Sequence, residues 1–471
     1  MFAIYSFLMG CAALWLTPYW LIQSLRHGKY LSNLGERLGF SFPGLTKNAV
    51  AAEKSIWLHA VSVGEVLSSV ALARKLKEDH PNRPLIISTT TLTGQALARE
   101  RMAFADGFLY FPLDWAFAVR RALSAVNPAA VVIVETEIWP NFLREAARRE
   151  ISVAFVSGRI SDRSFARYQK YLGVFGFFLR PLYRQALSVV TVFLMQSETD
   201  AERVRELGAP AERIKVGGNL KYDLAIPAAT PISQWLAGEA ARLGRSPVIV
   251  AGSVVANEEP LALIAFGTLQ GEYRKALLVL APRKPERFDA AAQFIEDFHV
   301  KYIRRSALQV PGPAQSAKGS SQTSKAETNG SAQLADDVKV ILLDSIGELP
   351  SLYGVGDHAF VGGSLVTSGG HNILEPATFG KVPVFGLSME NFSEMAARFV
   401  AAEAAIQAPS PEDVGVAWIE LQRDPQRMKR MGEAARTLVE RSRGATDRAA
   451  SEIAGILSNG AAAPRSAKAG G

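Results

Sequence analysis

The sequence predicts an α/β protein built from two successive doubly wound domains. Two series of short apolar runs alternate with helical stretches, and most runs are apolar on both faces. That pattern is typical of parallel strands covered by helices on both sides. A stretch of weak periodicity, 223–234, separates the two series and is expected to be the interdomain linker. Because such sheets bind ligands at the carboxyl ends of their strands, we expect a ligand cleft between the two domains.

Length and composition agree with this interpretation and exclude several classes of protein. The 471 residues suggest two or three domains, and 48% hydrophobic residues exclude wholesale disorder. A single cysteine excludes a disulfide framework, and no cysteine–histidine cluster has the spacing of a zinc site. The net charge of +7 indicates an anionic partner, which can be nucleic acid, acidic lipid or a phosphorylated substrate.

The N-terminus carries a long apolar segment. No residue of 1–25 is charged, and about 20 apolar residues suffice for a helix to span a bilayer. Basic residues follow at Arg26, His27 and Lys29, so the positive-inside rule puts the remaining chain in the cytoplasm. We therefore expect a transmembrane anchor at 1–25. A cleaved signal peptide, which would have its basic residues first, and an interfacial helix are the alternatives.

The first domain is expected at 26–225 and the second at 226–458. Strands of the first domain are predicted at 55–61, 84–89, 108–113, 129–136, 153–158 and 189–196. Strands of the second are predicted at 247–253, 276–282, 338–344, 358–364 and 382–386. Residues 306–337 are rich in Ser, Ala, Gly and Pro, which predicts a disordered insertion, and 459–471 are predicted to be a disordered tail.

The first candidate site is the motif HAVSVGE, from His59 to Glu65, where a buried strand passes into a helix. A carboxylate at that position can deprotonate an acceptor hydroxyl if partial burial raises its pKa. Alternatively, Glu65 only complements the dipole at the start of the helix. His59 is interpreted as a hydrogen-bonding residue at the end of the strand rather than as a metal ligand.

Two further motifs follow in the first domain. ETEIWPN begins at Glu135, and its two carboxylates end an apolar strand, so at least one should point into the cleft. No third acidic ligand is apparent, which argues against a metal motif, and helix capping is an equal alternative. GNLKYD places the cation of Lys221 beside the cleft, although a lone lysine before a linker is ordinarily only solvated.

Three strand-to-helix turns in the second domain suggest nucleotide binding. APRKPERF carries Arg283 at a helix start, SIGEL follows the next strand, and VGGSLVTSGGHNILEPA places two glycine pairs before Glu375. Glycine-rich turns with free helix-start amides hold phosphate, and a glutamate in the next turn can accept hydrogen bonds from ribose hydroxyls. The G-x-G-x-x-G fingerprint is absent, and plain turn geometry is the alternative.

Together, these six motifs and the apolar N-terminus followed by GERLGF resemble the bacterial 3-deoxy-D-manno-octulosonic acid (Kdo) transferases of lipopolysaccharide synthesis. The resemblance covers nearly the whole chain except 306–337 and the tail. It implies the GT-B fold, in which two Rossmann-like domains face a central cleft, with the acceptor domain first and the CMP-sugar domain second. It implies transfer of Kdo from CMP-Kdo to the lipid A precursor lipid IVA at the cytoplasmic face of the inner membrane.

The resemblance also assigns roles to individual residues. It implies that Glu65 is the proton acceptor and that Glu135 and Lys221 stabilise the transition state. The residues it implies for the CMP site are Pro282, Arg283, Ile346, Gly347, Glu348, Asn372, Ile373, Leu374 and Glu375.

The chemistry of the reaction is compatible with these roles. A monophosphate leaving group needs less neutralisation than a diphosphate, so helix N-termini with Arg283 and Lys221 can suffice, and no metal or other cofactor is expected. Direct displacement inverts the anomeric centre. Residues 159–184 mix arginines with aromatics and can dock on anionic membrane lipids, or form an ordinary basic helix pair. The alternatives are a UDP-sugar transferase of the same fold and a non-enzymatic binding protein, whereas no nucleic-acid-binding module is present.

Overall fold

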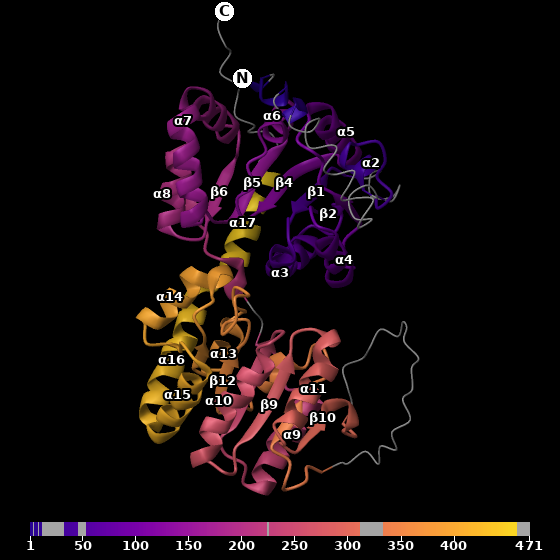
Figure 1. The fold of residues 1–471 in the computed structure, drawn as a ribbon. Helices are drawn as coiled ribbons and strands as arrows, with labels where there is room; N and C mark the ends of the chain where they lie inside the picture. The colour runs from indigo at the N-terminus through magenta and orange to yellow at the C-terminus, as the bar shows by residue number, and fades with distance from the viewer. Residues whose placement is uncertain are drawn as a thin grey trace, which may run out of the picture. The chain divides into compact units, whose positions relative to one another are not determined.

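The computed structural model describes residues 1–2, 4–7, 9–11, 33–45, 53–223, 226–310 and 333–458. The chain forms two compact units (Figure 1). The first unit contains Met1–Asp223 together with Ser442–Gly471, and the second contains Leu224–Arg441.

The first unit is built on a parallel sheet of seven strands in the order β3-β2-β1-β4-β5-β6-β7. The strands are β1 (Ser55–His59), β2 (Leu85–Thr89), β3 (Gly107–Tyr110), β4 (Pro128–Val134), β5 (Ser152–Gly158), β6 (Val192–Met195) and β7 (Ile214–Val216). The helices are α2 (Leu34–Arg37), α3 (Val63–Asp79), α4 (Leu92–Arg101), α5 (Ala116–Val126), α6 (Pro140–Arg148), α7 (Asp162–Leu187), α8 (Glu198–Glu206) and α17 (Ala445–Ser458).

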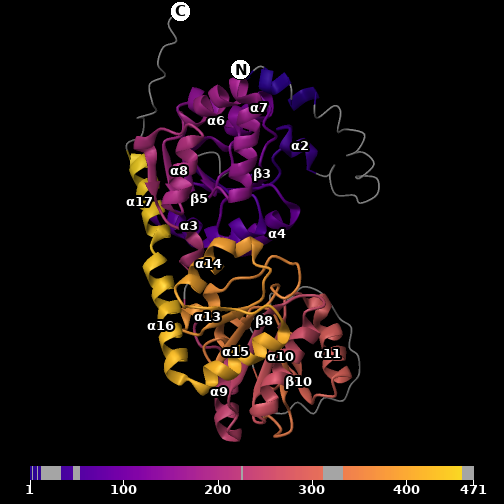
Figure 2. The ribbon, with the colours of Figure 1, turned by 60° about the vertical axis from the view of Figure 1, so that its left-hand side comes forward.

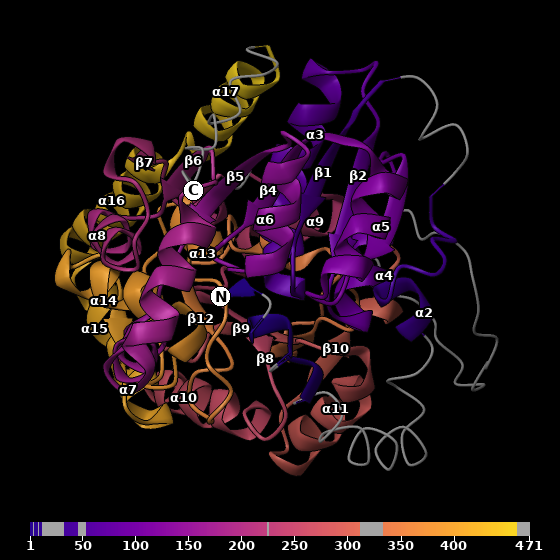
Figure 3. The same ribbon diagram turned by 90° about the horizontal axis from the view of Figure 1, so that it is seen from above.

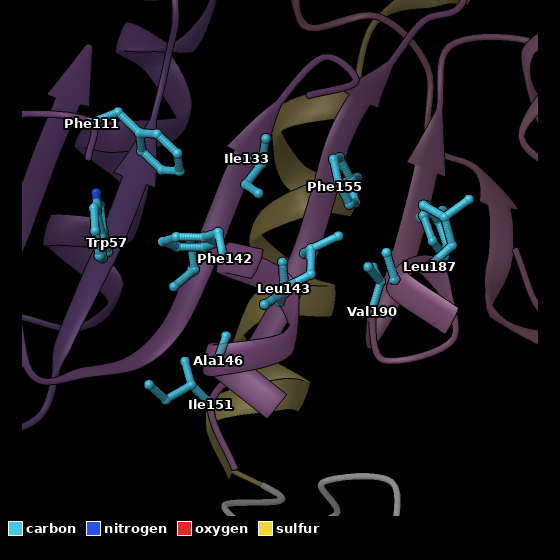
Figure 4. Close-up of a cluster of buried hydrophobic side chains, with 14 of the residues drawn as sticks. Trp57, Phe111, Ile133, Phe142, Leu143, Ala146, Ile151, Phe155, Leu187 and Val190 are labelled. Atoms are coloured by element: carbon cyan, nitrogen blue, oxygen red, sulfur yellow. The ribbon is translucent and has the colours of Figure 1, made fainter. Parts of the chain in front are cut away.

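Both faces of this sheet are buried, which explains why its strands are apolar throughout. Side chains of alternate residues go to opposite faces: Trp57 belongs to one core and Leu58 to the other. Figure 4 shows the first core, where Trp57 and Ile133 from the strands lie near Phe142 of α6. The rings of Trp57 and Phe142 meet edge to face with their centroids 5.4 Å apart.

The last helix of the chain returns to the first unit. In α17, Ala445, Ala449 and Ile453 are buried in the second core of the first unit, and the helix lies beside α3 (Figure 3). The expected second domain, 226–458, is therefore wrong at its C-terminal end, because unit two stops at Arg441. Helical periodicity shows that α17 buries one face, but it does not show against which sheet.

The second unit repeats the architecture, with the parallel order β10-β11-β9-β8-β12-β13-β14. Its strands are β8 (Val248–Val254), β9 (Leu277–Pro282), β10 (Tyr302–Arg304), β11 (Val340–Leu342), β12 (His358–Val361), β13 (Pro383–Phe385) and β14 (Ile406–Gln407). Its α-helices are α9 (Pro231–Leu243), α10 (Glu259–Glu272), α11 (Phe288–Asp297), α12 (Leu349–Leu352), α13 (Leu374–Thr378), α14 (Ser393–Ala401), α15 (Pro411–Arg423) and α16 (Pro425–Ser442). Helices α10 and α15 pack side by side on it (Figure 2).

The prediction of two doubly wound parallel sheets is confirmed, but three strands were missed. These are β7, β10 and β14, which have at most three residues each and are edge strands of their sheets. None of their residues is fully buried, so they lack the apolar run that marks the other strands. The linker is also shorter than expected, because α9 begins at Pro231, capped by the side chain of Thr230.

The predicted insertion 306–337 is too wide at both borders. A 3₁₀ turn covers Arg305–Ala307, and Leu308 and Leu334 are buried in the core of the second unit. The amide of Leu334 also donates a hydrogen bond to Glu239, so sparse apolar residues suffice to order these flanks. Residues 311–332 and the predicted tail 459–471 lie outside the described residues.

The expected anchor, 1–25, lies mostly outside the described residues as well. Its described part is helical, and its hydroxyl group at Ser6 hydrogen-bonds to Asn141 of α6. Phe2 is buried, with the guanidinium of Arg144 over its ring. Among the residues that the structure describes, no helix combines the length and apolarity needed to cross a membrane.

Candidate active site

The order of strands reverses once in each sheet, and the candidate motifs lie at these two points. In the first unit β1 pairs with both β2 and β4, and in the second β8 pairs with both β9 and β12. In doubly wound sheets the ligand crevice opens beyond the carboxyl ends of the strands at the reversal. Glu65 follows β1 and Glu135 follows β4, while the glycine-rich motif follows β12.

Glu65 lies in the first turn of α3, and its carboxylate is held in place by its own loop. Ser62 is the N-cap residue of the helix, and its hydroxyl donates a hydrogen bond of 2.9 Å to Glu65 Oε1. The amide of Val61 donates one of 2.7 Å to Oε2. Glu65 is therefore placed to complement the helix dipole, which is the alternative considered from the sequence. Each carboxylate oxygen still has a second lone pair, so capping does not prevent Glu65 from accepting a proton.

Glu135 and Lys221 form an ion pair beside Glu65. The Lys221 ammonium lies 3.4 Å from Glu135 Oε1, and both side chains are about three-quarters buried, being 21% and 26% exposed. Glu135 has a φ of +61°, a left-handed conformation that is costly for a residue with a side chain. Lys221 is positioned by a 3₁₀ turn that Asn219 caps with its side chain.

The pKa of Glu65 is raised to about 7, mainly because burial penalises the charged form and secondly because Glu135 is negative. The hydrogen bonds from Val61 and Ser62 and the charge of Lys221 lower it in part. A carboxylate whose pKa is near neutrality can take a proton from a hydroxyl and release it again. The structure therefore brings the three predicted catalytic residues together.

Glu137 is a fourth member of this group, which we call the acidic cluster (Glu65, Glu135, Glu137 and Lys221). Burial, Glu65 and Glu135 together raise the pKa of Glu137 to about 7. The motif ETEIWPN contains two carboxylates, and the resemblance assigned a role only to the first, Glu135. Either could have pointed inward, since the irregular segment after β4 does not keep the alternation of a strand.

His59 has a structural role. Its Nδ1 lies 2.9 Å from the hydroxyl of Ser88, and its ring stacks on Phe111 with centroids 3.9 Å apart. Burial lowers the pKa of His59 to about 3, so the ring is neutral. The prediction that His59 is a hydrogen-bonding residue at the strand end is confirmed.

In the second unit a buried carboxylate organises the loop after β12. Glu258 accepts hydrogen bonds from the amides of Gly363, Ser364 and Leu365 at 2.6, 2.9 and 2.9 Å. Its side chain is fully buried, and burial raises its pKa although these hydrogen bonds lower it in part. Nothing in the sequence identified Glu258, because the loop amides that it binds lie more than a hundred positions away.

Glycine is required in this loop for two reasons. A Cβ on Gly362 would lie 2.6 Å from the carbonyl oxygen of Ser253 and 2.7 Å from Val254 Cα, because the ends of β12 and β8 touch there. Gly369 has a φ of +87°, which strongly favours glycine. The glycine pairs therefore serve close packing and left-handed turns.

Arg283 follows β9 and acts electrostatically on the helix start after the glycine loop. Its positive charge contributes to lowering the pKa of His371, which burial takes to about 4, so that ring is neutral. Burial raises the pKa of Glu375 to about 7, while Arg283 and a hydrogen bond from Asn372 act in the opposite direction. Arg283 and Asn372 thus both act on the carboxylate of Glu375.

A basic cavity adjoins Arg283. It has a volume of about 470 Å³ and is lined by residues that follow β8, β9 and β12. These are Val254, Val255, Ala256, Asn257, Arg283, Lys284, Arg287, Val366, Thr367 and Ser368. Arg287 is paired with the buried Glu259 at 2.8 Å, whereas the structure shows no ion pair for Arg283 or Lys284 within the described residues. The cavity therefore has unpaired positive charge, which suits an anion.

The other residues assigned to the CMP site differ in how much of the side chain is free to contact a ligand. Glu348 is buried and makes a two-pronged ion pair with Arg305, both contacts being 2.9 Å, so its carboxylate is occupied by the protein. Ile373 and Leu374 are fully buried, which leaves only their backbone for a ligand. Pro282 is the last residue of β9, Ile346 is 51% exposed, and Gly347 has a φ of +94°.

Related proteins indicate the same family. A sequence profile of the 3-deoxy-D-manno-octulosonic acid transferases matches residues 32–224. A transferase of that name from Haemophilus influenzae is 30% identical over 94% of this chain and 95% of its own. One from Bordetella pertussis is 32% identical over 83% of this chain and 85% of its own. The chain belongs to this family. It is a glycosyltransferase.

Solved structures support the fold of this transferase. A putative UDP-N-acetylglucosamine 2-epimerase from Listeria monocytogenes is similar with a TM-score of 0.53 and 11% identity, over 87% of this chain and 97% of its own. The UDP-N-acetylglucosamine 2-epimerase from Neisseria meningitidis also has a TM-score of 0.53, with 12% identity over 86% of this chain and 100% of its own. At this identity the similarity concerns the fold alone.

In the described part of the transferase, no group of three or more His, Cys, Asp or Glu side chains is arranged to hold a metal ion. The acidic cluster contains three carboxylates, but its positive charge is supplied by Lys221.

Proposed function

We propose that this transferase moves Kdo from CMP-Kdo to lipid IVA in lipopolysaccharide synthesis, with inversion and with Glu65 as the general base. The observation that supports the mechanism best is the acidic cluster, in which the pKa of Glu65 is raised to about 7 beside the Glu135–Lys221 pair. The names of the relatives support the sugar. The acceptor and the donor nucleotide rest on the resemblance of the motifs.

In the proposed step, a hydroxyl oxygen of the acceptor attacks the anomeric carbon of Kdo. The bond from that carbon to the phosphate oxygen of CMP breaks, and the electron pair leaves with CMP. The hydroxyl proton passes to Glu65, whose carboxylate is fixed by Val61 and Ser62. Lys221 stabilises the negative charge near the base, and Glu135 holds Lys221 in position.

The second unit is proposed to hold the donor. Arg283 and Lys284, whose guanidinium and ammonium groups line the cavity, bind the phosphate, and Glu375 accepts hydrogen bonds from the ribose hydroxyls. The unpaired charges of Arg283 and Lys284 in the 470 Å³ cavity suit an anionic donor. A departing monophosphate needs only these cations, and on this proposal no metal or other cofactor takes part.

The proposed location is the inner membrane, with a single-pass anchor within residues 1–25 and both units in the cytoplasm. The uncharged sequence and the basic residues after it support this orientation.

The test is transfer by the purified full chain supplied with CMP-Kdo and lipid IVA, with the product identified by mass spectrometry. Addition of Kdo to lipid IVA with inversion is expected, and EDTA should not reduce the rate. Binding of CMP without any product would refute the acceptor. Tighter binding of UDP than of CMP would refute the donor and favour a UDP-sugar enzyme.

A further inference from the structure

Helix α7 is a hairpin rather than a straight rod. Phe175 has non-helical dihedral angles, with φ −117° and ψ 22°. The rings of Tyr168 and Tyr183 meet edge to face with centroids 5.7 Å apart. Residues that far apart in sequence would be separated by about 22 Å in a straight helix. The two arms therefore run back to back, and the tip of the hairpin lies around Phe175.

The tip of this hairpin exposes aromatic side chains to solvent. Tyr171 is 49% exposed, Phe175 is 59% and Phe177 is 100%. The N-terminal helix lies at the same end of the first unit as α7 (Figures 1 and 2), and there Ile4 is 53% and Phe7 is 70% exposed. Several large apolar side chains exposed at one end of a unit indicate contact with another apolar phase.

A basic groove lies between the arms of the hairpin and the end of α8. Its volume is about 800 Å³, and its walls include Arg180, Arg184 and Arg205. No ion pair or side-chain hydrogen bond joins these arginines to the rest of the described chain. Glu206 also lines the groove, but its carboxylate accepts a hydrogen bond of 3.1 Å from Gln169, and three arginines against one glutamate leave the walls positively charged.

The groove and the tip are parts of one surface. Phe177, Arg180 and Arg184 are spaced i, i+3 and i+7, so they lie on one face of the second arm. The end of α8 approaches this face closely, because a Cβ on Gly208 would lie 3.0 Å from Arg184 Cα. The surface therefore has exposed aromatic side chains at its tip and unpaired guanidinium groups next to them. Interfacial helices have the same order, with apolar side chains among the acyl chains and basic side chains at the headgroups.

We propose that the groove binds the phosphate of an anionic phospholipid headgroup while the aromatic tip enters the membrane interface. Guanidinium groups bind phosphate through two parallel hydrogen bonds, and several of them together favour it strongly. Aromatic side chains favour the headgroup level of a bilayer. The proposal shares with the proposed function only the need for a membrane, and it makes no use of the sugar donor.

Hydrogen–deuterium exchange on the full chain in lipid nanodiscs tests this proposal, because it reports on α7 separately from the N-terminus. Exchange of residues 171–188 is measured in phosphatidylcholine alone and with phosphatidylglycerol added. We expect at least threefold slower exchange with the anionic lipid. The triple variant R180Q/R184Q/R205Q should lose that difference, and Phe177→Ser should reduce protection at the tip in both lipids.

The control variant R430Q/R436Q/R441Q removes the same charge from exposed positions of α16. It should keep the full lipid-dependent protection, and an equal loss would show that only net charge matters and overturn the proposal. Glycerol phosphate added at millimolar concentration to phosphatidylcholine discs should not reproduce the protection. If it did, the groove would be a site for free phosphate instead. Unchanged exchange of β1 and β4 in each variant establishes that it is folded.

Discussion

The ammonium of Lys221 lies 3.4 Å from a carboxylate oxygen of Glu135, although the two residues are 86 positions apart in sequence. The carboxyl end of β4 supplies Glu135, and the 3₁₀ turn after β7 supplies Lys221. The pair places the cation of Lys221 beside Glu65. Burial and the negative charge of Glu135 raise the pKa of Glu65, and Lys221 lowers it in part. The reactivity of Glu65 thus depends on residues from three separate strand ends.

Replacing Glu65 with Gln should reduce kcat by about 10²–10⁴-fold, because a general base contributes that much to proton transfer. Affinity for CMP should remain within about twofold, since Glu65 belongs to the first unit. Isothermal titration with CMP and a steady-state assay measure both quantities. Glu78→Gln, at an exposed position of the same helix, should leave both unchanged. A large loss of CMP affinity in Glu65→Gln would assign it to donor binding instead.

The pH dependence of kcat should show a limb near pH 7, with activity falling at lower pH because Glu65 becomes protonated. Lys221 lowers the pKa of Glu65, so Lys221→Met should move this limb to higher pH as well as reduce the maximal rate. Lys221→Arg keeps the charge and should retain the wild-type limb. A limb that stays in place in Lys221→Met would exclude electrostatic contact between the two groups during turnover.

Glu137→Gln should stabilise the first unit at pH 8 and have almost no effect near pH 4. The folded pKa of Glu137 is about 7, above its ordinary value, so stability is highest at low pH and declines as pH rises through 7. Removing the charge removes that decline. Thermal denaturation at both pH values measures the effect. The same variant should move the kcat limb of Glu65 to lower pH, because one repelling charge is gone. Equal melting temperatures at pH 8 would contradict the prediction.

Glu258→Ala should lower the free energy of unfolding of the second unit by about 3 kcal/mol, because buried amide groups lose a charged acceptor. The glycine loop should then lose its order and CMP affinity should fall. Denaturant unfolding and CMP titration measure the two effects. Glu286→Gln, an exposed residue near Arg283, serves as the control and should change neither. Loss of stability with unchanged CMP affinity would separate this loop from the donor site.

Ile453→Ala should destabilise the first unit by about 2–4 kcal/mol, because the side chain is fully buried in the core beneath α17. The second unit should be unaffected, although α17 follows it directly in sequence. Hydrogen exchange resolved by unit distinguishes the two. Ser451→Ala, on the exposed face of the same helix, should have almost no effect. Faster exchange in the second unit would contradict the assignment of α17.

The motifs that could be identified from sequence are those in which one short segment contains both a strand end and its polar residues. Glu65, Glu135 and Arg283 are examples, since a buried apolar run immediately precedes each. Glu258 could not be identified, because its role comes from amides that only the folded sheet brings near it. That α17 packs on the first sheet could not be predicted for the same reason. Its amphipathic periodicity shows that one face is buried but does not show which sheet covers that face. The three missed strands are edge strands and lack buried residues.

The return of α17 to the first sheet has a consequence for biosynthesis. The first unit lacks the buried side chains of Ala449 and Ile453 until the ribosome has made almost the whole chain. The second unit is complete at Arg441 and can fold while the first still exposes apolar surface on one side of its sheet. During translation, therefore, the half of the protein that emerges first is the half that finishes folding last, and a chain truncated before α17 would be a substrate for chaperones and proteases.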